Sequence, residues 1–119
     1  MKANTTATIS SAITASGSGS NINIVADQVA ITAGISAAGD IVAISPISSA
    51  RNIDLGAADS VSVLGLTDTE LDNVTAATLR IGDAVRSQNI NVSANISIAS
   101  AKVTNLAIRG TGNVTTTNS

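Results

Sequence analysis

The stretch Ile22-Asn23-Ile24-Val25-Ala26-Asp27-Gln28-Val29-Ala30-Ile31 contains two short alternations of aliphatic and other residues. Successive side chains of a strand point to opposite faces, so an alternation of period two predicts a half-buried β-strand. Gly, Asn, Asp, Ser and Ala separate these alternations along the chain and favour turns. Six more alternations follow: Ile53-Asp54-Leu55, Val61-Ser62-Val63, Leu79-Arg80-Ile81, Ile90-Asn91-Val92, Ile96-Ser97-Ile98 and Leu106-Ala107-Ile108. The pattern predicts an all-β chain of short strands and frequent turns.

The apolar residues are almost all aliphatic. The chain of 119 residues holds 15 Ile, 10 Val and 6 Leu but no Phe, Tyr, Trp, His or Cys. Aromatic side chains usually anchor the core of a compact globule, whereas β-branched residues suit the flat layers of stacked strands. We therefore expect a core of thin aliphatic layers, without disulfides to strengthen it.

Two series of aliphatic positions recur at steps of 17 to 20 residues. A repeat of this length is typical of one coil of a parallel β-helix, in which each strand stacks on its equivalent one coil away. The spacing predicts a β-solenoid of about six short coils. The two series are Ile22, Ile41, Val61, Leu79, Ile96, Val114 and Ile35, Ile53, Leu71, Ile90, Ile108.

One segment, residues 67–74, departs from the strand pattern and predicts a short helical insertion. Thr67 and Glu70 are spaced as a capping box, in which each side chain bonds an amide at the helix start. Leu66 and Leu71 stand at the positions of a hydrophobic staple. The acidic residues of this segment suit the positive end of the helix dipole.

Residues 47–56 (ISSARNIDLG) and 64–82 (LGLTDTELDNVTAATLRIG) resemble a recurring block of filamentous-haemagglutinin-type bacterial exoproteins. The resemblance covers about residues 44–82. It implies a right-handed parallel β-helix, export through an outer-membrane partner or a fused barrel, and roles in adhesion, aggregation or biofilm. Ala77 stands where the block usually has Gly, and Asn73 where a basic residue is commoner. The resemblance assigns no catalytic or ligand residues.

Charge and composition exclude several function classes. A net charge of −2, without a basic block, argues against nucleic acid and against a polybasic membrane anchor. The apolar runs are too short to span a bilayer, and residues 1–6 lack the apolar core of a signal peptide. Without His and Cys, the chain cannot build Ser-His-Asp or Cys-His catalysis or a usual zinc site.

Two groups of acidic residues are candidates for metal binding or catalysis. Asp68, Glu70 and Asp72 alternate as Ca²⁺ ligands do, but the spacing lacks the other features of a calcium loop, so helix capping is the preferred interpretation. Asp40 and Asp59 lie 19 positions apart, so neighbouring coils would bring together two carboxylates, as glycoside hydrolysis requires. A solvated pair is the plainer interpretation, since no aromatic residue is present to stack on sugars.

The remaining motifs favour structural interpretations. Gly17-Ser18-Gly19 and Gly110-Thr111-Gly112 lack the Lys-Ser/Thr of a phosphate loop and predict turns. A regular Thr-x-Thr array would indicate an ice-binding plane, but the motif occurs only at Thr6-Ala7-Thr8 and Thr115-Thr116-Thr117. Asn-x-Ser/Thr glycosylation sequons begin at five positions, a number that composition alone explains: Asn4, Asn73, Asn91, Asn95 and Asn113.

We therefore expect residues 1–119 to form a single β-solenoid segment of a longer repetitive protein, with frayed ends at 1–8 and 112–119. The expected function is structural: a shaft or passenger segment of a bacterial adhesin, extracellular or at the cell surface, without catalytic, cofactor-binding or metal-binding residues. The alternative is a ligand-binding or self-assembling solenoid for glycans or ice. The expected partners are neighbouring repeats, copies of the chain stacked end to end, or a host-surface protein or glycan, with no nucleic acid and no membrane span.

Overall fold

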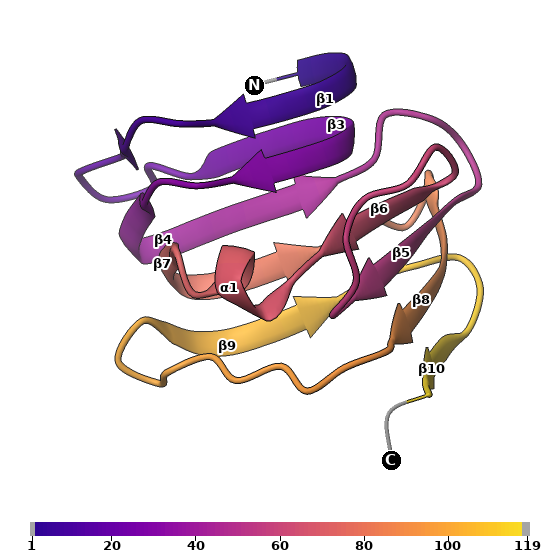
Figure 1. The fold of residues 1–119 in the computed structure, drawn as a ribbon. Helices are drawn as coiled ribbons and strands as arrows, with labels where there is room; N and C mark the ends of the chain where they lie inside the picture. Colours follow the sequence, from indigo (N-terminus) through magenta and orange to yellow (C-terminus); the bar gives the residue numbers. More distant parts are fainter. Residues whose placement is uncertain (1, 118–119) are drawn as a thin grey trace.

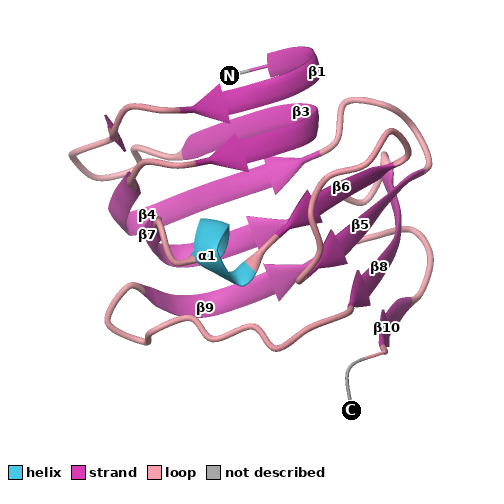
Figure 2. Ribbon diagram, in the orientation of Figure 1, coloured by secondary structure: helices cyan, strands magenta, loops and turns pink. Residues whose placement is uncertain are grey.

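The computed structural model describes residues 2–117, and this part of the chain is mostly β-strand (Figures 1 and 2). One short helix, α1 (Asp68–Leu71), interrupts the strands. The all-β prediction is confirmed. The strands are β1 (Lys2–Ile9), β2 (Ile13–Thr14), β3 (Ile22–Ile31), β4 (Ile35–Ser45), β5 (Arg51–Leu55), β6 (Val63–Leu66), β7 (Val74–Ile81), β8 (Ser87–Val92), β9 (Val103–Ile108) and β10 (Val114–Thr116).

The strands form two sheets. The first has the order β1-β3-β4-β7-β9, with the short β2 beside β4, and the second has the order β10-β8-β5-β6. Within residues 2–117 every strand pairing is parallel. Parallel neighbours cannot be joined by a hairpin, because the chain must first return to the end where the previous strand began. The chain therefore crosses each sheet repeatedly in one direction (Figure 1).

The register aligns aliphatic residues in columns across the strands. Two columns cross β3, β4, β7 and β9 of the first sheet, and one crosses β6, β5, β8 and β10 of the second. Their members are Ile22–Val42–Leu79–Leu106, Ile24–Ile44–Ile81–Ile108 and Leu64–Ile53–Ile90–Val114. Most of these side chains are buried in one continuous aliphatic core between the sheets. The expected core of stacked aliphatic layers is present.

The helix α1 lies inside the predicted insertion of residues 67–74, and its capping box is confirmed. Thr67 is the N-cap, and its hydroxyl accepts a hydrogen bond from the Glu70 amide at 3.3 Å. The Glu70 carboxylate accepts the Thr67 amide at 3.0 Å. Leu66 and Leu71, on either side of the cap, are fully buried. The two reciprocal bonds explain why a helix begins where the strand β6 ends.

Two of the predicted strands are wrong. The alternation Val61-Ser62-Val63 lies mostly in a bend, with Val61 94% exposed, and β6 begins only at its last residue. The alternation Ile96-Ser97-Ile98 lies outside any strand, although Ile96 and Ile98 pack against the core. Three residues of period two are too few to distinguish a strand from a loop that turns two apolar side chains inward.

The predicted series of repeats does not match the observed register. Ile22 pairs with Val42, not with Ile41, and Val42 pairs with Leu79, almost two expected steps further along the chain. The extra length is residues 56–73, which contain both β6 and α1. We call this longer segment, and not the predicted helical segment 67–74, the insertion. It adds β6 as a second strand beside and parallel to β5 before the chain returns to the first sheet at β7. One passage of the chain therefore supplies two strands to the second sheet.

The segments expected to fray, 1–8 and 112–119, contain all of β1 except Ile9 and the whole of β10. The strand β1 pairs with β3, and β10 pairs with β8. Residues 1, 118 and 119 lie outside the described part of the chain. Ala77, where the resemblance led us to expect Gly, has no positive φ and lies in β7.

Candidate functional site

Two of the three acidic residues considered for metal binding, Asp68 and Glu70, bond the neighbouring loop, the helix cap and β3. The Asp68 carboxylate accepts the Ser97 amide at 2.6 Å. Glu70 binds the Thr67 amide, the Thr67 hydroxyl at 2.8 Å and the Ile31 amide at 3.1 Å. Within residues 2–117 no three acidic side chains gather where they could hold a metal ion. The capping interpretation of this cluster therefore fits the geometry.

Asp40 and Asp59 each bind a separate pair of backbone amides. The Asp40 carboxylate accepts the amides of Gly19 at 2.9 Å and Ser20 at 3.2 Å. The Asp59 carboxylate accepts the amides of Val29 at 2.8 Å and Gly65 at 2.9 Å. The two carboxylates thus hold different segments of the chain, and the hypothesis of a facing pair for glycoside hydrolysis finds no support in this geometry.

Asp59 belongs to a set of side chains that attach the insertion to β3, a role that no motif in the sequence predicted. Asp59 binds the Val29 amide, Glu70 binds the Ile31 amide, and the Asn73 side-chain amide donates to the Ile31 carbonyl at 3.2 Å. These bonds satisfy backbone groups of β3 where the insertion lies against it. The insertion is therefore attached to β3 by side chains.

Burial raises the pKa of the Asp59 carboxyl, and the nearby Glu70 charge raises it further. The hydrogen bonds from Gly65 and Val29 oppose this shift without overcoming it. At Gly65 the chain passes so close to the Ala58 backbone that an added Cβ would lie 2.3 Å from the Ala58 carbonyl carbon. The tight turn of the insertion around Asp59 therefore requires glycine at this position.

Asp27 and Asp83 stabilise turns in the same way. Although burial opposes it, hydrogen bonds from the Ser48 hydroxyl and amide and the Arg51 charge hold the pKa of Asp27 below its ordinary value. The Arg51 guanidinium lies 3.8 Å from the Asp27 carboxylate. Burial likewise opposes the shift at Asp83, but the amides of residues 85–87 and the Arg86 charge hold its pKa below the ordinary value. Both acids are ionised structural anchors.

The glycine-rich segments are occupied by internal hydrogen bonds. The Gly19 amide donates to Asp40, and the Thr111 and Gly112 amides donate to the carbonyls of Ser87 and Gln88 at 2.8 and 2.9 Å. An anion would have to compete with these acceptors, so neither segment is arranged as a phosphate loop. Both behave as the turns that were predicted.

The two Thr-x-Thr motifs lie in different sheets. Thr6 and Thr8 are exposed on β1 of the first sheet, and the Thr6 hydroxyl donates to the Gln28 side chain at 2.9 Å. Thr115 lies on β10 of the second sheet, where its hydroxyl donates to Asn91 at 3.1 Å. Since the motifs share no face, they do not extend one another into a regular threonine plane.

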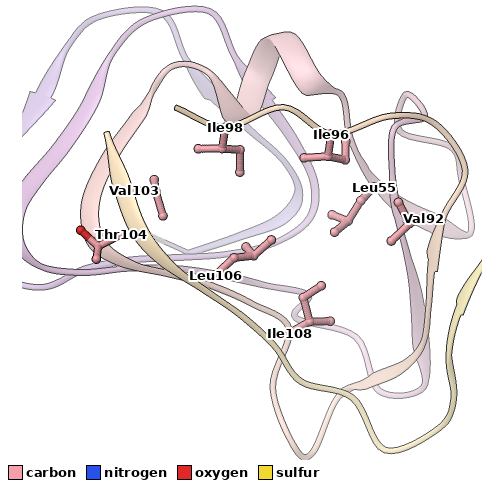
Figure 3. Close-up of a pocket in the computed structure, with 8 residues that line it drawn as sticks. All are labelled: Leu55, Val92, Ile96, Ile98, Val103, Thr104, Leu106 and Ile108. Carbon is pink, nitrogen blue, oxygen red and sulfur yellow. The ribbon is translucent and has the colours of Figure 1, made fainter. Parts of the chain in front are cut away.

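The strongest candidate site is an apolar cleft of about 340 Å³ at the end of the stack formed by β9 (Figure 3). We call it the terminal cleft. Its walls come from β5, β8, β9 and the segment between the last two, and Thr104 supplies the one polar side chain of the lining. No lining residue is titratable, so the cleft is suited to aliphatic groups and not to acid–base chemistry. The lining residues are Leu55, Val92, Ile96, Ile98, Val103, Thr104, Leu106 and Ile108.

The terminal cleft exists because the aliphatic columns stop without a cover. Leu106 and Ile108 continue the columns of Leu79 and Ile81, which are fully buried, but Leu106 itself is 44% exposed. The sequence contained a signal for this site, since Ile96-Ser97-Ile98 and Leu106-Ala107-Ile108 are aliphatic alternations close to the end of the chain. Their opening into one cleft depends on the fold and was not predicted.

Comparison with family models, curated proteins and solved structures finds no match to this chain. In the part of the chain that the structure describes, no helix has the length and hydrophobicity that crossing a membrane requires. The site must therefore be interpreted from its own geometry.

Proposed function

We propose that this chain is a segment of a right-handed parallel β-helix, and that it forms part of the shaft or passenger of a filamentous-haemagglutinin-type bacterial exoprotein. In this role it projects or displays other regions of a longer exported protein at the cell surface or outside the cell. It has no catalytic activity, and it contributes a diffuse polar surface to adhesion.

The main observation behind this proposal is the parallel register of the aliphatic columns. Ile24, Ile44, Ile81 and Ile108 lie side by side on four adjacent strands. In a parallel β-helix, equivalent strands of successive coils stack in this way, and the columns hold the coils together. About six coils were expected; the first sheet has five strands along its path and the second has four.

The carboxylates support a structural role. Those of Asp40, Asp59, Asp68 and Asp83 accept hydrogen bonds from backbone amides. A catalytic carboxylate must instead face a substrate. The separation of the two Thr-x-Thr motifs weighs against an ice-binding plane, and the aliphatic lining of the terminal cleft offers little to a glycan. The ligand-binding alternative is therefore less well supported than the shaft.

Surface exposure tests the proposed location and role. Antibodies raised against this chain should label intact cells that produce the full protein, and brief treatment with an external protease should remove the label. A cytoplasmic protein serves as the control for cell lysis. Labelling that appears only after permeabilisation would contradict a surface or secreted shaft.

A further inference from the structure

The strand β3 has one edge that no other strand covers, in the interior of the fold. Its residues 28–31 pair with β1, and its residues 22–25 pair with β4 on the opposite side. In the part of the chain that the structure describes, no strand continues along that opposite side past β4. Asp27, Val29 and Ile31 direct their backbone groups to this side, because alternate residues of a strand face the same edge. We call it the inner edge of β3.

Two carboxylates bind the amides of the inner edge. The Asp59 carboxylate accepts the Val29 amide at 2.8 Å, and the Glu70 carboxylate accepts the Ile31 amide at 3.1 Å. Both acids are partly buried. They lie where the carbonyl groups of a neighbouring strand would otherwise accept these two amides.

Two donor side chains bind the carbonyls of the same edge. The Arg51 guanidinium donates to the Asp27 carbonyl at 2.9 Å, and the Asn73 side-chain amide donates to the Ile31 carbonyl at 3.2 Å. The Arg51 side chain is only 10% exposed. Acceptors thus meet amides and donors meet carbonyls, as in the ladder of a paired strand. We call these four the edge-capping side chains: Arg51, Asp59, Glu70 and Asn73.

The two carboxylates also prevent the insertion from pairing directly with β3. Asp59 accepts the Gly65 amide at 2.9 Å, and Glu70 accepts the Thr67 amide at 3.0 Å. Each carboxylate therefore lies between an amide of β3 and an amide of the insertion. The contact between the two segments is closed by side chains, which can be removed singly without altering the backbone.

The inner edge has no protection of its own. Residues 28–31 read QVAI, without a charge or a proline, which are the usual means of preventing strand addition. Val29 and Ile31 are buried in the core, as are Leu64 and Leu66 of the insertion. If the insertion moved away, an unpaired edge and the aliphatic side chains beneath it would be uncovered together. An extended strand with alternating aliphatic residues would satisfy both.

We infer that the edge-capping side chains prevent the inner edge of β3 from pairing with a strand of a second copy of this chain. A second copy is the partner that fits, because its own strands pair in parallel and contain the aliphatic alternation that this core accepts. The inference goes beyond the proposed function, since every contact on which it depends lies within the fold of one copy.

Removing both carboxylates tests this inference. Asp59→Ala with Glu70→Ala should form oligomers whose size rises with protein concentration in sedimentation velocity, beyond any association of the parent chain. Hydrogen exchange then shows where the copies meet. In the oligomer, the amides of Val29 and Ile31 should exchange at least about tenfold more slowly than in the dilute monomeric variant, because a strand of another copy accepts them.

Two controls keep all four edge-capping side chains. Asp68→Ala with Asp72→Ala removes the same number of charges from the same segment. Leu79→Ala removes a fully buried side chain and lowers stability without contact to the inner edge. Both controls should associate no more than the parent chain. Equal association of Leu79→Ala and the double carboxylate variant would overturn the inference, because instability alone would then explain it.

Two further results would overturn the inference: a folded double carboxylate variant that stays as monomeric as the parent chain, or an oligomer in which Val29 and Ile31 exchange no more slowly. If circular dichroism shows that the double variant does not fold, Asp59→Ala alone uncovers the Val29 amide and is compared with Leu79→Ala in the same way. Asp59→Asn with Glu70→Gln keeps one acceptor oxygen at each position and should associate less than the alanine variant.

Discussion

Replacing Asp59 with alanine should loosen the insertion from β3. The change removes the carboxylate that accepts the amides of Val29 and Gly65, at 2.8 and 2.9 Å. Leaving a buried donor without a partner costs about 1–3 kcal/mol. Two donors are affected, but removing a carboxyl whose pKa is raised by burial also recovers part of its desolvation cost. We expect Asp59→Ala to lower the free energy of unfolding by about 2–3 kcal/mol.

Far-ultraviolet circular dichroism is the suitable probe, because the chain has no Trp or Tyr for fluorescence. In urea, a slope of about 1–3 kcal/mol per molar converts this loss into a fall of roughly 0.7–3 M in the midpoint. Asp59→Asn retains one carbonyl oxygen as an acceptor and should show about half the effect. Asp72→Ala is the control of equal charge, since no described donor bonds its carboxylate.

Hydrogen exchange places the effect at the predicted amides. A loss of 2–3 kcal/mol in the local opening equilibrium should accelerate exchange of the Val29 and Gly65 amides by roughly 30- to 150-fold. Amides in β9 should change only with global stability. Equal midpoints for Asp59→Ala and Asp72→Ala, with unchanged exchange at Val29, would show that the carboxylate does not hold the insertion.

Three further predictions concern packing and pH. Leu79→Ala, in the fully buried middle of a column, should lower the free energy of unfolding by about 2–5 kcal/mol. Leu106→Ala, at the 44% exposed end of the same column, should cost roughly half as much in a dilute monomeric sample. Equal losses in urea titrations would contradict an open end to this column. Gly65→Ala should lower the free energy of unfolding by about 1–3 kcal/mol, because the new Cβ would overlap the Ala58 backbone. A thermal midpoint equal to that of the parent chain would refute this close approach. The pKa of Asp83 in the folded chain is below its ordinary value, so the carboxylate stabilises the fold above the ordinary pKa, and this stabilisation is lost as pH falls through the lowered pKa. Asp83→Asn should therefore be less stable than the parent chain near neutral pH and should approach the stability of the parent in strong acid. A difference in stability that is independent of pH would argue against this role.

Local patterns in the sequence predicted the individual elements well. The alternations at Ile22-Asn23-Ile24 and Leu79-Arg80-Ile81 lie in β3 and β7, because period two directly records which side chains face the core. The capping box of α1 was equally readable, since its two residues bond amides within three positions of one another. Such features depend only on neighbours in the chain.

The register could not be predicted in the same way. Val42 pairs with Leu79 because the insertion adds a second strand before the chain returns to the first sheet. This detour is held against β3 by hydrogen bonds of Asp59 and Glu70 to residues that lie 30 and 39 positions away in the sequence. The spacing of aliphatic residues contains no record of such contacts. The attachment of the insertion by Asp59 was missed for the same reason, because the sequence does not show which backbone amides lack a partner.

The side-chain attachment of the insertion also has an evolutionary consequence. A backbone ladder requires each added strand to match its neighbour in length and alignment, so gain or loss of a few residues would disrupt it. The side chains of Asp59, Glu70 and Asn73 reach β3 from outside any strand, so they allow a passage of unusual length between ordinary ones. A lineage of such proteins could therefore drift in the length of its repeats while preserving the aliphatic interior beneath them.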